Sequence, residues 1–432
     1  MRLFPIAFSL FFTVIICFSL SVDASDSNKT DTTQTSIFRK NELNYGFVFQ
    51  GFPEREEMRS DISFEYEELM MNSFKFRLTE KCWNYTVFKQ ESWGYMLEGG
   101  LFGGKGNTID STSQAMIEAD NNVFGMLGRI SGDYINRYYY DSRNYTLVSI
   151  NGRARYDYYR RNSEGTLVDS NFVSSTYTDC SDKSRFRIAF NARAGWGIGR
   201  LKNINHYVAA KRLLEIYYPK RVFSEEEAEQ LKNEIARIKH SRNRKEGYSV
   251  EQELKQLSDF FTREMLLEEP SAPQYDWMLT EFSPRYDGTR FELGPFFNYF
   301  NYEPDFIYGG YIKYENNKYR NPEWNRELCI NVNYNKYKNH DWVFMETILG
   351  WSYYPGLKSE CSFGIKYIPA FDIRDWNDIG PVRHNIIPYF KYFTQVNPRY
   401  RIDIALAYRI APNEQYMLPG PEFSVSVYKS RY

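Results

Sequence analysis

The stretch from Thr289 to Tyr432 constrains the fold most, because apolar and polar side chains alternate along it in segments of about ten residues. In Arg399–Ile410, one set of alternate positions is apolar and the other is mostly charged. Successive side chains of a strand point to opposite faces, so this segment predicts a strand with one apolar and one charged face. Val382–Thr394 has the same pattern, and the turn at 395–398 joins the two segments as an antiparallel hairpin. Repeated along the stretch, the pattern predicts a transmembrane β-barrel.

The composition agrees with a barrel. The chain has 432 residues, 54 basic and 55 acidic, and a formal net charge of -1. This balance argues against a nucleic-acid partner, which favours a concentrated basic surface. Mean hydropathy is low at -0.59, yet 18% of the residues are aromatic. Only alternate residues of a barrel strand face lipid, and aromatic residues form girdles at both interfaces.

Residues 1–24 are predicted to be a cleaved signal peptide, because Arg2 precedes the apolar segment Leu3–Leu20 and small residues follow it at 22 and 24. A retained anchor is the alternative. The polar residues 25–36 predict a disordered leader. Export together with amphipathic strands predicts the outer membrane of a Gram-negative bacterium. The expected partners are outer-membrane lipid and the barrel assembly machinery, whose signal the terminal Tyr432 partly matches.

The rest of the chain divides by its periodicity. Residues 37–141 leave three interpretations open: a periplasmic domain, a plug, or early barrel strands. Residues 142–200 predict the first barrel strands, with a polar turn at Arg160–Gly165. Residues 201–270 predict an amphipathic helical insert on the periplasmic side, able to bind a periplasmic partner, with capping boxes at Ser224 and Ser249. Residues 271–432 predict the C-terminal barrel strands, which resume near Gln274 and have alternately short and long connections.

The strand segments from Tyr145 onward predict about 12 strands, within a range of about 10 to 16. Glycines at 195, 197 and 199 surround Trp196 and Ile198 and lead into Arg200, and Ser-Glu-Glu-Glu begins a helix at Ser224. Together with the signal peptide and the aromatic strands, these features resemble uncharacterised, porin-like outer-membrane barrel proteins of Gram-negative bacteria. The resemblance covers Tyr145–Tyr432. It implies a barrel fold and an outer-membrane location, and it implies no substrate and no catalytic residue.

The charged face of the strands is predicted to line the lumen. Its residues are Arg153, Arg155, Asp157, Arg187, Arg193, Glu292, Glu327, Glu346, Glu360, Arg383, Lys391, Arg401, Asp403 and Arg409. The apolar face is predicted to meet lipid through Ile188, Phe190, Trp196, Phe390, Tyr392, Ile402, Ile404, Leu406 and Tyr408. Charges in a lumen must be paired or hydrated, so a solute-selecting pore and an interior closed by salt bridges both remain open.

These patterns predict a porin-like or transport channel for small solutes. The alternative is a non-conducting barrel that acts as a surface, scaffold or binding protein. A barrel hydrolase of lipid or peptide is disfavoured, because His340 and His384 lack an accompanying nucleophile motif. We expect no catalytic residue, no cofactor and no metal. Cys361 on the outer face cannot pair with Cys329 on the inner face, and a disulfide between Cys82 and Cys180 is left open.

Overall fold

The computed structural model describes residues 38–59, 63–112, 115–241, 249–268, 276–277, 280, 284–302, 304–338, 340–375, 378–379, 382–397, 399–411 and 419–431. The chain divides into one unit of Met1–Thr35 and another of Ser36–Tyr432, and the described residues all belong to the second. The predicted signal peptide at 1–24, the leader at 25–36 and the strand restart at Gln274 lie outside the described residues.

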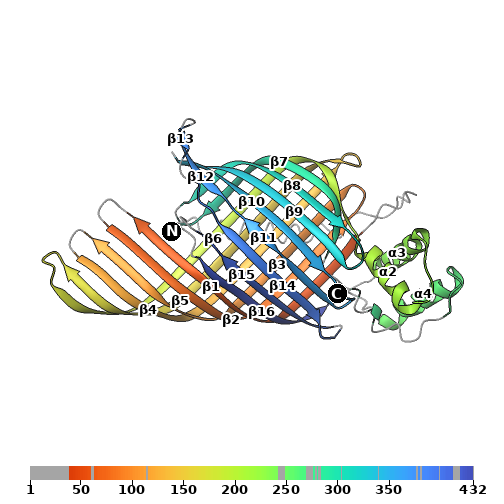
Figure 1. Ribbon diagram of the computed structural model, residues 1–432, viewed down its shortest axis with the longest axis horizontal. Helices are drawn as coiled ribbons and strands as arrows, with labels where there is room; N and C mark the ends of the chain where they lie inside the picture. Colours follow the sequence, from red (N-terminus) through yellow and green to blue (C-terminus); the bar gives the residue numbers. More distant parts are fainter. Residues whose placement is uncertain are drawn as a thin grey trace, which may run out of the picture. The chain divides into compact units, whose positions relative to one another are not determined.

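The described residues form mainly strands, and the longer helices interrupt them at one place in the chain (Figure 1). The strands are β1 (Phe38–Arg59), β2 (Ser63–Tyr85), β3 (Lys89–Thr112), β4 (Ala115–Tyr139), β5 (Asn144–Asp169), β6 (Ser174–Asn203), β7 (Tyr286–Phe300), β8 (Phe306–Tyr319), β9 (Trp324–Tyr337), β10 (His340–Tyr353), β11 (Ser359–Tyr367), β12 (Ala370–Asp375), β13 (Asp378–Ile379), β14 (Ile386–Gln395), β15 (Tyr400–Arg409) and β16 (Gly420–Arg431). The longer helices are α2 (Asn205–Tyr217), α3 (Glu225–His240) and α4 (Val250–Arg263).

Within the described residues, 14 strands close into an antiparallel barrel. Strands β1 to β10 pair in chain order, β11 and β14 to β16 continue the ring, and β16 returns to β1. The remaining strands, β12 and β13, form a hairpin that extends β11 along β10. The predicted all-β antiparallel barrel is therefore confirmed, and the predicted number of about 12 strands is too low.

The predicted count contains two errors of opposite sign, because four N-terminal strands are missed and one later strand is divided in two. Residues 38–139 form four long strands, although their glycines look like interruptions in the sequence. Gly100 is a close contact in the sheet, since a Cβ there would lie 2.2 Å from the carbonyl oxygen of Phe74. The predicted turn at Arg160–Gly165 is wrong, because β5 continues through it and pairs with β6, as in Arg160↔Asp182. In that part of β5 both faces carry polar residues, so apolar and polar residues no longer alternate although the strand continues.

Strands β1 to β6 run past the ring as an open sheet (Figure 1). The register of β1 with β16 reaches Gly51↔Phe423, and that of β6 with β7 reaches Ala189↔Phe300. Beyond these pairs, among the described strands, β1 pairs only with β2 and β6 only with β5. We call this part of β1 to β6 the protruding sheet.

The two ends of the barrel differ in what they carry. The start of β1, the end of β16 and the insert between β6 and β7 all lie at one end, which we call the helix end. The opposite end, which we call the far end, carries the protruding sheet. The short connections at 302–304 and 338–340 lie at the far end, whereas the one at 396–398 lies at the helix end. The predicted alternation of short and long connections is therefore wrong.

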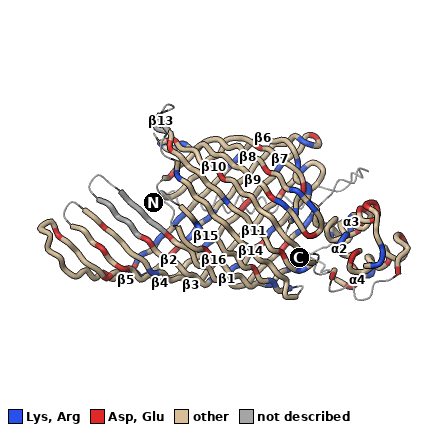
Figure 2. Tube along the Cα trace, in the orientation of Figure 1, with Lys and Arg blue, Asp and Glu red and all other residues tan. Residues whose placement is uncertain are grey.

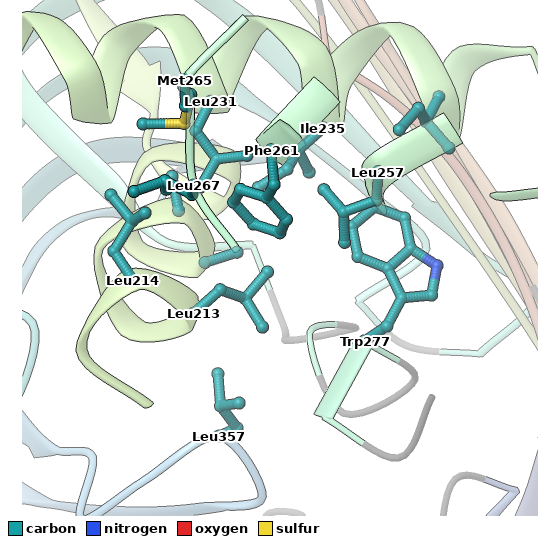
Figure 3. Packing of buried hydrophobic residues seen from close by; sticks show 13 residues of the cluster. Leu213, Leu214, Leu231, Ile235, Leu257, Phe261, Met265, Leu267, Trp277 and Leu357 are labelled. Carbon is teal, nitrogen blue, oxygen red and sulfur yellow. The ribbon is translucent and has the colours of Figure 1, made fainter. Parts of the chain in front are cut away.

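The helices pack around their own apolar core, shown in Figure 3. It includes Leu213 of α2, Ile235 of α3 and Phe261 of α4, together with Leu357 from the connection between β10 and β11. The capping box at Ser224 is confirmed, whereas Ser249 makes no side-chain cap, so the second predicted box does not form. Within the described residues, no helix is both long and apolar enough to cross a membrane.

Candidate functional site in the barrel interior

Ion pairs between strands that are not neighbours identify the inner face of the barrel. Arg137 on β4 and Glu292 on β7 approach to 3.1 Å past β5 and β6, which is feasible only inside the ring. Arg401 on β15 and Glu42 on β1 likewise meet at 2.9 Å past β16. Because paired residues share a face, the registers extend this assignment to every ring strand.

Most of the predicted lumen residues lie on the inner face. They are Arg153, Arg155, Asp157, Arg187, Arg193, Glu292, Glu327, Glu346, Glu360, Lys391, Arg401, Asp403 and Arg409. Arg383 does not belong to a ring strand. It bridges to Ala370 and pairs with Asp372 of β12 at 3.0 Å, because the chain before Ile386 leaves the ring to form the β12–β13 hairpin. Its predicted place on a lumen-lining strand is therefore wrong.

The outer face carries an exposed apolar belt. The predicted lipid-facing residues all lie on it: Trp196, Phe390, Leu406 and Tyr408 are exposed, and Ile188, Phe190, Tyr392, Ile402 and Ile404 are half-buried. Strands that the sequence did not resolve continue the belt through Phe47, Phe74, Phe76, Leu101, Phe124 and Met126. On β6 it runs from Phe186 to Ile198, which at about 3.3 Å per residue and about 45° tilt spans roughly 28 Å.

A buried ionic cluster lies on the inner face toward the helix end. Glu292 accepts a hydrogen bond of 3.1 Å from the hydroxyl of Tyr145 and pairs with Arg137. Beside it, Arg290 donates to Glu315 at 2.8 Å, and Lys313 lies 3.0 Å from the same carboxylate. Alternating charges of this kind leave each buried charge with an opposite partner, which offsets the cost of removing it from water.

The inner face of β2 to β6 forms a basic wall. We define it as Lys75, Arg77, Arg129, Arg153, Arg155, Arg187 and Arg193. In the same part of these strands the acidic inner residues are Glu98, Asp133 and Asp157. Glu98 is surrounded by Arg77 at 2.5 Å, Lys75 at 3.8 Å and Arg129 at 3.8 Å. Charged residues lie on strands all around the barrel (Figure 2), but this wall is mainly cationic.

The sequence indicated part of this wall without resolving it. The alternation of Phe74, Phe76 and Leu78 gave β2 its strand character, and the intervening Lys75 and Arg77 belong to the wall. Since the neighbours of β2 could not be identified, neither the wall nor its pairing with Glu98 on β3 could be predicted.

Inward tyrosines lie flat against inward glycines. A Cβ on Gly197 would lie 2.3 Å from the ring of Tyr145, and one on Gly350 would lie 2.5 Å from the hydroxyl of Tyr389. These aromatic side chains therefore follow the wall and do not project toward the barrel axis. In agreement, the inward-facing side chains of Arg153, Glu327 and Lys391, on three different strands, are solvent-exposed.

Contacts between distant strands narrow the helix end. The hydroxyls of Tyr85 on β2 and Tyr286 on β7 are 2.9 Å apart, and Gln90 on β3 donates to the carbonyl of Leu201 on β6 at 2.6 Å. The helices contact the ring at two separate places. The amide of Arg39 on β1 bonds to His240, and Arg212 donates to the carbonyl of Tyr354 after β10.

The cysteines and histidines that the sequence singled out lie on separate strands and connections. Cys180 is an exposed free thiol, so the Cys82–Cys180 disulfide does not form. Cys361 lies on the outer face and Cys329 on the inner face. His384 bonds to the hydroxyl of Tyr367. In the described part of the chain, no three His, Cys, Asp or Glu side chains gather closely enough to hold a metal ion.

Comparison with known proteins yields structural neighbours only. No protein-family model matches the chain. None of the curated proteins matches it either. The transport unit of the autotransporter AIDA-I from Escherichia coli is similar at 10% identity, with 98% of this chain and 97% of that chain covered and a TM-score of 0.30. The CymD monoaromatic hydrocarbon channel is similar at 9% identity, with 90% and 88% covered and a TM-score of 0.31.

The outer membrane protease OmpT from Escherichia coli is also similar, at 8% identity, with 93% of this chain and 98% of that chain covered and a TM-score of 0.28. These neighbours are outer-membrane β-barrels, and this chain is a closed barrel too. The expected barrel fold is confirmed by the strand pairing of this chain itself. At such TM-scores the neighbours support no conclusion about activity.

Proposed function

We propose that the protein is an outer-membrane channel for small solutes and that its lumen favours anions. The exposure of Arg153, Glu327 and Lys391 on the inner face carries the proposal. Inward side chains that water can reach on three separate strands require space inside the ring. A ring of 14 strands lies between the filled eight-stranded barrels and the porins of about 16 strands, so it has room for a lumen.

The apolar belt supports a membrane location. Phe74 is 54% exposed and Leu406 is 49% exposed, and such side chains continue around the ring. Water-facing surfaces of monomers rarely carry contiguous apolar areas of this extent. The roughly 28 Å height of the belt on β6 suits the hydrocarbon core of a bilayer, which is about 30 Å thick. Because the number of strands is even, the start of β1 and the end of β16 lie at the same end of the barrel. We propose that this end, the helix end, faces the periplasm.

The preference for anions follows from the basic wall. Arg129 lies opposite Arg155 in the β4–β5 register, Arg153 is the next inward residue of β5, and Glu98 is the acidic neighbour of Arg129 at 3.8 Å. Rings and rows of arginine favour anions in pores, because they stabilise a negative ion that has left part of its hydration shell. The opposite inner strands mix Glu327 and Glu346 with Lys366 and Lys391, so they do not cancel this preference.

The test is single-channel recording in planar bilayers with a KCl gradient across the membrane. We expect steady current steps and a reversal potential of the sign that marks chloride preference. The double variant Arg129→Gln, Arg153→Gln should keep the steps and shift the reversal potential toward cation preference. Arg160→Gln, on the outer face of β5, is the matched control and should leave it unchanged. Steps with cation preference in the unchanged protein would contradict the proposed selectivity.

The second candidate is a non-conducting barrel that binds a partner or serves as a scaffold. The Tyr85–Tyr286 contact and the helices at the helix end favour it, because they narrow that end of the barrel. The same recording separates the two functions. A correctly assembled protein without current steps, in which Tyr85→Ala also gives none, would support the non-conducting barrel.

A further inference from the structure

Three asparagines lie side by side on the inner face of β5, β6 and β7. Asn151 pairs with Asn191, and Asn191 pairs with Asn298, so the three side chains form a row across the strands. The side-chain nitrogen of Asn191 donates a hydrogen bond to the side-chain oxygen of Asn298. Asn151 is exposed and the other two are half-buried, so water inside the barrel reaches all three. We call these residues the asparagine row.

Arg153 lies beside the row, on the same strand and face as its exposed member. Its neighbours in the register are Ser131 on β4 and Ala189 on β6, whose short side chains leave the guanidinium exposed. Arg155, the next inward residue of β5, pairs with Asp157 at 2.7 Å, whereas no carboxylate in the described part of the chain forms an ion pair with Arg153. Arg153 can therefore bind an anion from the lumen without giving up an acidic partner.

The asparagine row offers hydrogen bonds that suit hydroxyl groups. A side-chain amide has two N–H donors and an accepting oxygen, and a hydroxyl both donates and accepts. The single bond between Asn191 and Asn298 leaves donor and acceptor capacity on each of them. Phe300 is the next inward residue after Asn298, and its half-buried ring adds an apolar surface for C–H groups.

Asp133 borders the row on the β4 side. It pairs with Asn151 in the register and is exposed. A carboxylate accepts hydrogen bonds from hydroxyls and repels a second carboxylate. An acid bound here is therefore oriented, with its carboxylate at Arg153 and its hydroxyls toward Asp133.

We propose that the asparagine row and Arg153 form a binding site for sugar acids, with the carboxylate on Arg153 and the hydroxyls on the row. At about 4.8 Å between strands and about 3.3 Å per residue, the site measures roughly 10 Å by 7 Å, which suits a single sugar ring. It lies next to the far end, since the pair of Ala189 with Phe300 is the last between β6 and β7. The inference rests on the proposed channel and names its substrate class, but binding itself does not require conduction.

The experiment is saturation-transfer-difference NMR on the full chain in lipid nanodiscs, titrated with sodium D-glucuronate. D-glucose has the hydroxyls without the carboxylate, and cyclohexanecarboxylate has the carboxylate without the hydroxyls. We expect saturable binding of glucuronate beyond that of empty nanodiscs. It should be about tenfold tighter than binding of either comparison ligand, because each of these lacks the groups that one half of the site recognises.

Two variants separate the halves of the site. Arg153→Gln should weaken glucuronate about tenfold and leave glucose unchanged. Asn151→Ala should weaken glucuronate and glucose alike, about fivefold, and leave cyclohexanecarboxylate unchanged. Arg160→Gln, on the outer face of β5, is the matched control and should change none of the three affinities. The heat-modifiable band on an unheated gel shows that each variant is assembled.

Equal affinity for glucuronate and either comparison ligand, or no binding beyond that of empty nanodiscs, would overturn the site. An unchanged glucuronate affinity in assembled Arg153→Gln or Asn151→Ala protein would overturn it as well. Conductance recorded on the same preparation tests the channel separately. Binding without current would retain the site and reject the channel, and current without binding would do the reverse.

Discussion

The backbone amide of Arg39, the second residue of β1, donates a hydrogen bond of 3.1 Å to Nε2 of His240, the last residue of α3. The ring of His206 at the start of α2 lies 5.7 Å from that of His240, edge to face. A ring nitrogen that accepts from an amide cannot carry a proton, so this contact between the helices and the barrel requires neutral His240.

The first prediction concerns pH. Burial first, and then the nearby Arg39 and Lys239, lower the pKa of His240 from 6.5 to about 4. When the helices are detached from the barrel, His240 takes up a proton below pH 6.5. When they are attached, His240 stays neutral down to about pH 4. Attachment is therefore fully stable above pH 6.5 and weakens as the pH falls toward 4. Hydrogen exchange at the Arg39 amide should speed up, relative to distant barrel amides, between pH 6.5 and 5.

His240→Gln supplies the control for this prediction. The glutamine carbonyl can accept the Arg39 hydrogen bond but does not titrate, so the pH dependence of attachment should disappear. If the dependence persists in this variant, His206 or a carboxylate of the helices is responsible and the assignment to His240 is wrong.

The second prediction concerns the apolar belt. Leu406 lies near the middle of the β15 outer face, between Ile404 and Tyr408. A cation near the middle of a bilayer costs about 2–4 kcal/mol in a barrel, so Leu406→Arg should reduce the yield of assembled protein, measured as the heat-modifiable band on an unheated gel. Ala407→Arg puts the same charge on the inner face opposite Glu422 and should assemble normally. Equal yields of the two variants would contradict the membrane placement of the outer face.

How far the sequence predicts this fold depends on what each strand face meets. In β15 one face is apolar and the other is charged, so alternation alone identifies the strand and its two faces. Beyond Tyr159, β5 belongs to the protruding sheet. Both of its faces carry polar residues there, so the sequence resembles a turn although the strand continues. The interior depends on ring closure. Glu42 and Arg401 are 359 residues apart in sequence, and only the pairing of β1 with β16 brings them together.

The third prediction tests the contacts between tyrosine and glycine. A methyl group at Gly350 would press on the Tyr389 hydroxyl, which ends a side chain that can rotate away from the wall. Gly350→Ala should therefore leave assembly intact and lower single-channel conductance, because the ring moves into the lumen. Adding Tyr389→Ala should restore conductance to at least the original value. A conductance that Gly350→Ala leaves unchanged would show that Tyr389 does not border the conducting path.

The fourth prediction concerns the ion pair that closes the ring. The side chains of Arg401 and Glu42 are 2% and 9% exposed, and Lys40 also lies 2.7 Å from Glu42. Glu42→Gln leaves the Arg401 charge buried without its acid, which typically costs about 3–5 kcal/mol. The free energy of unfolding in urea, measured in lipid vesicles, should fall by that order. Glu422→Gln is the matched comparison, because its pair with Arg409 at 2.5 Å is 32% and 21% exposed and should contribute only about 1 kcal/mol or less. Similar losses in both variants would mean that burial does not set the strength of these pairs, and that Glu42 has no special part in joining the first strand to the last.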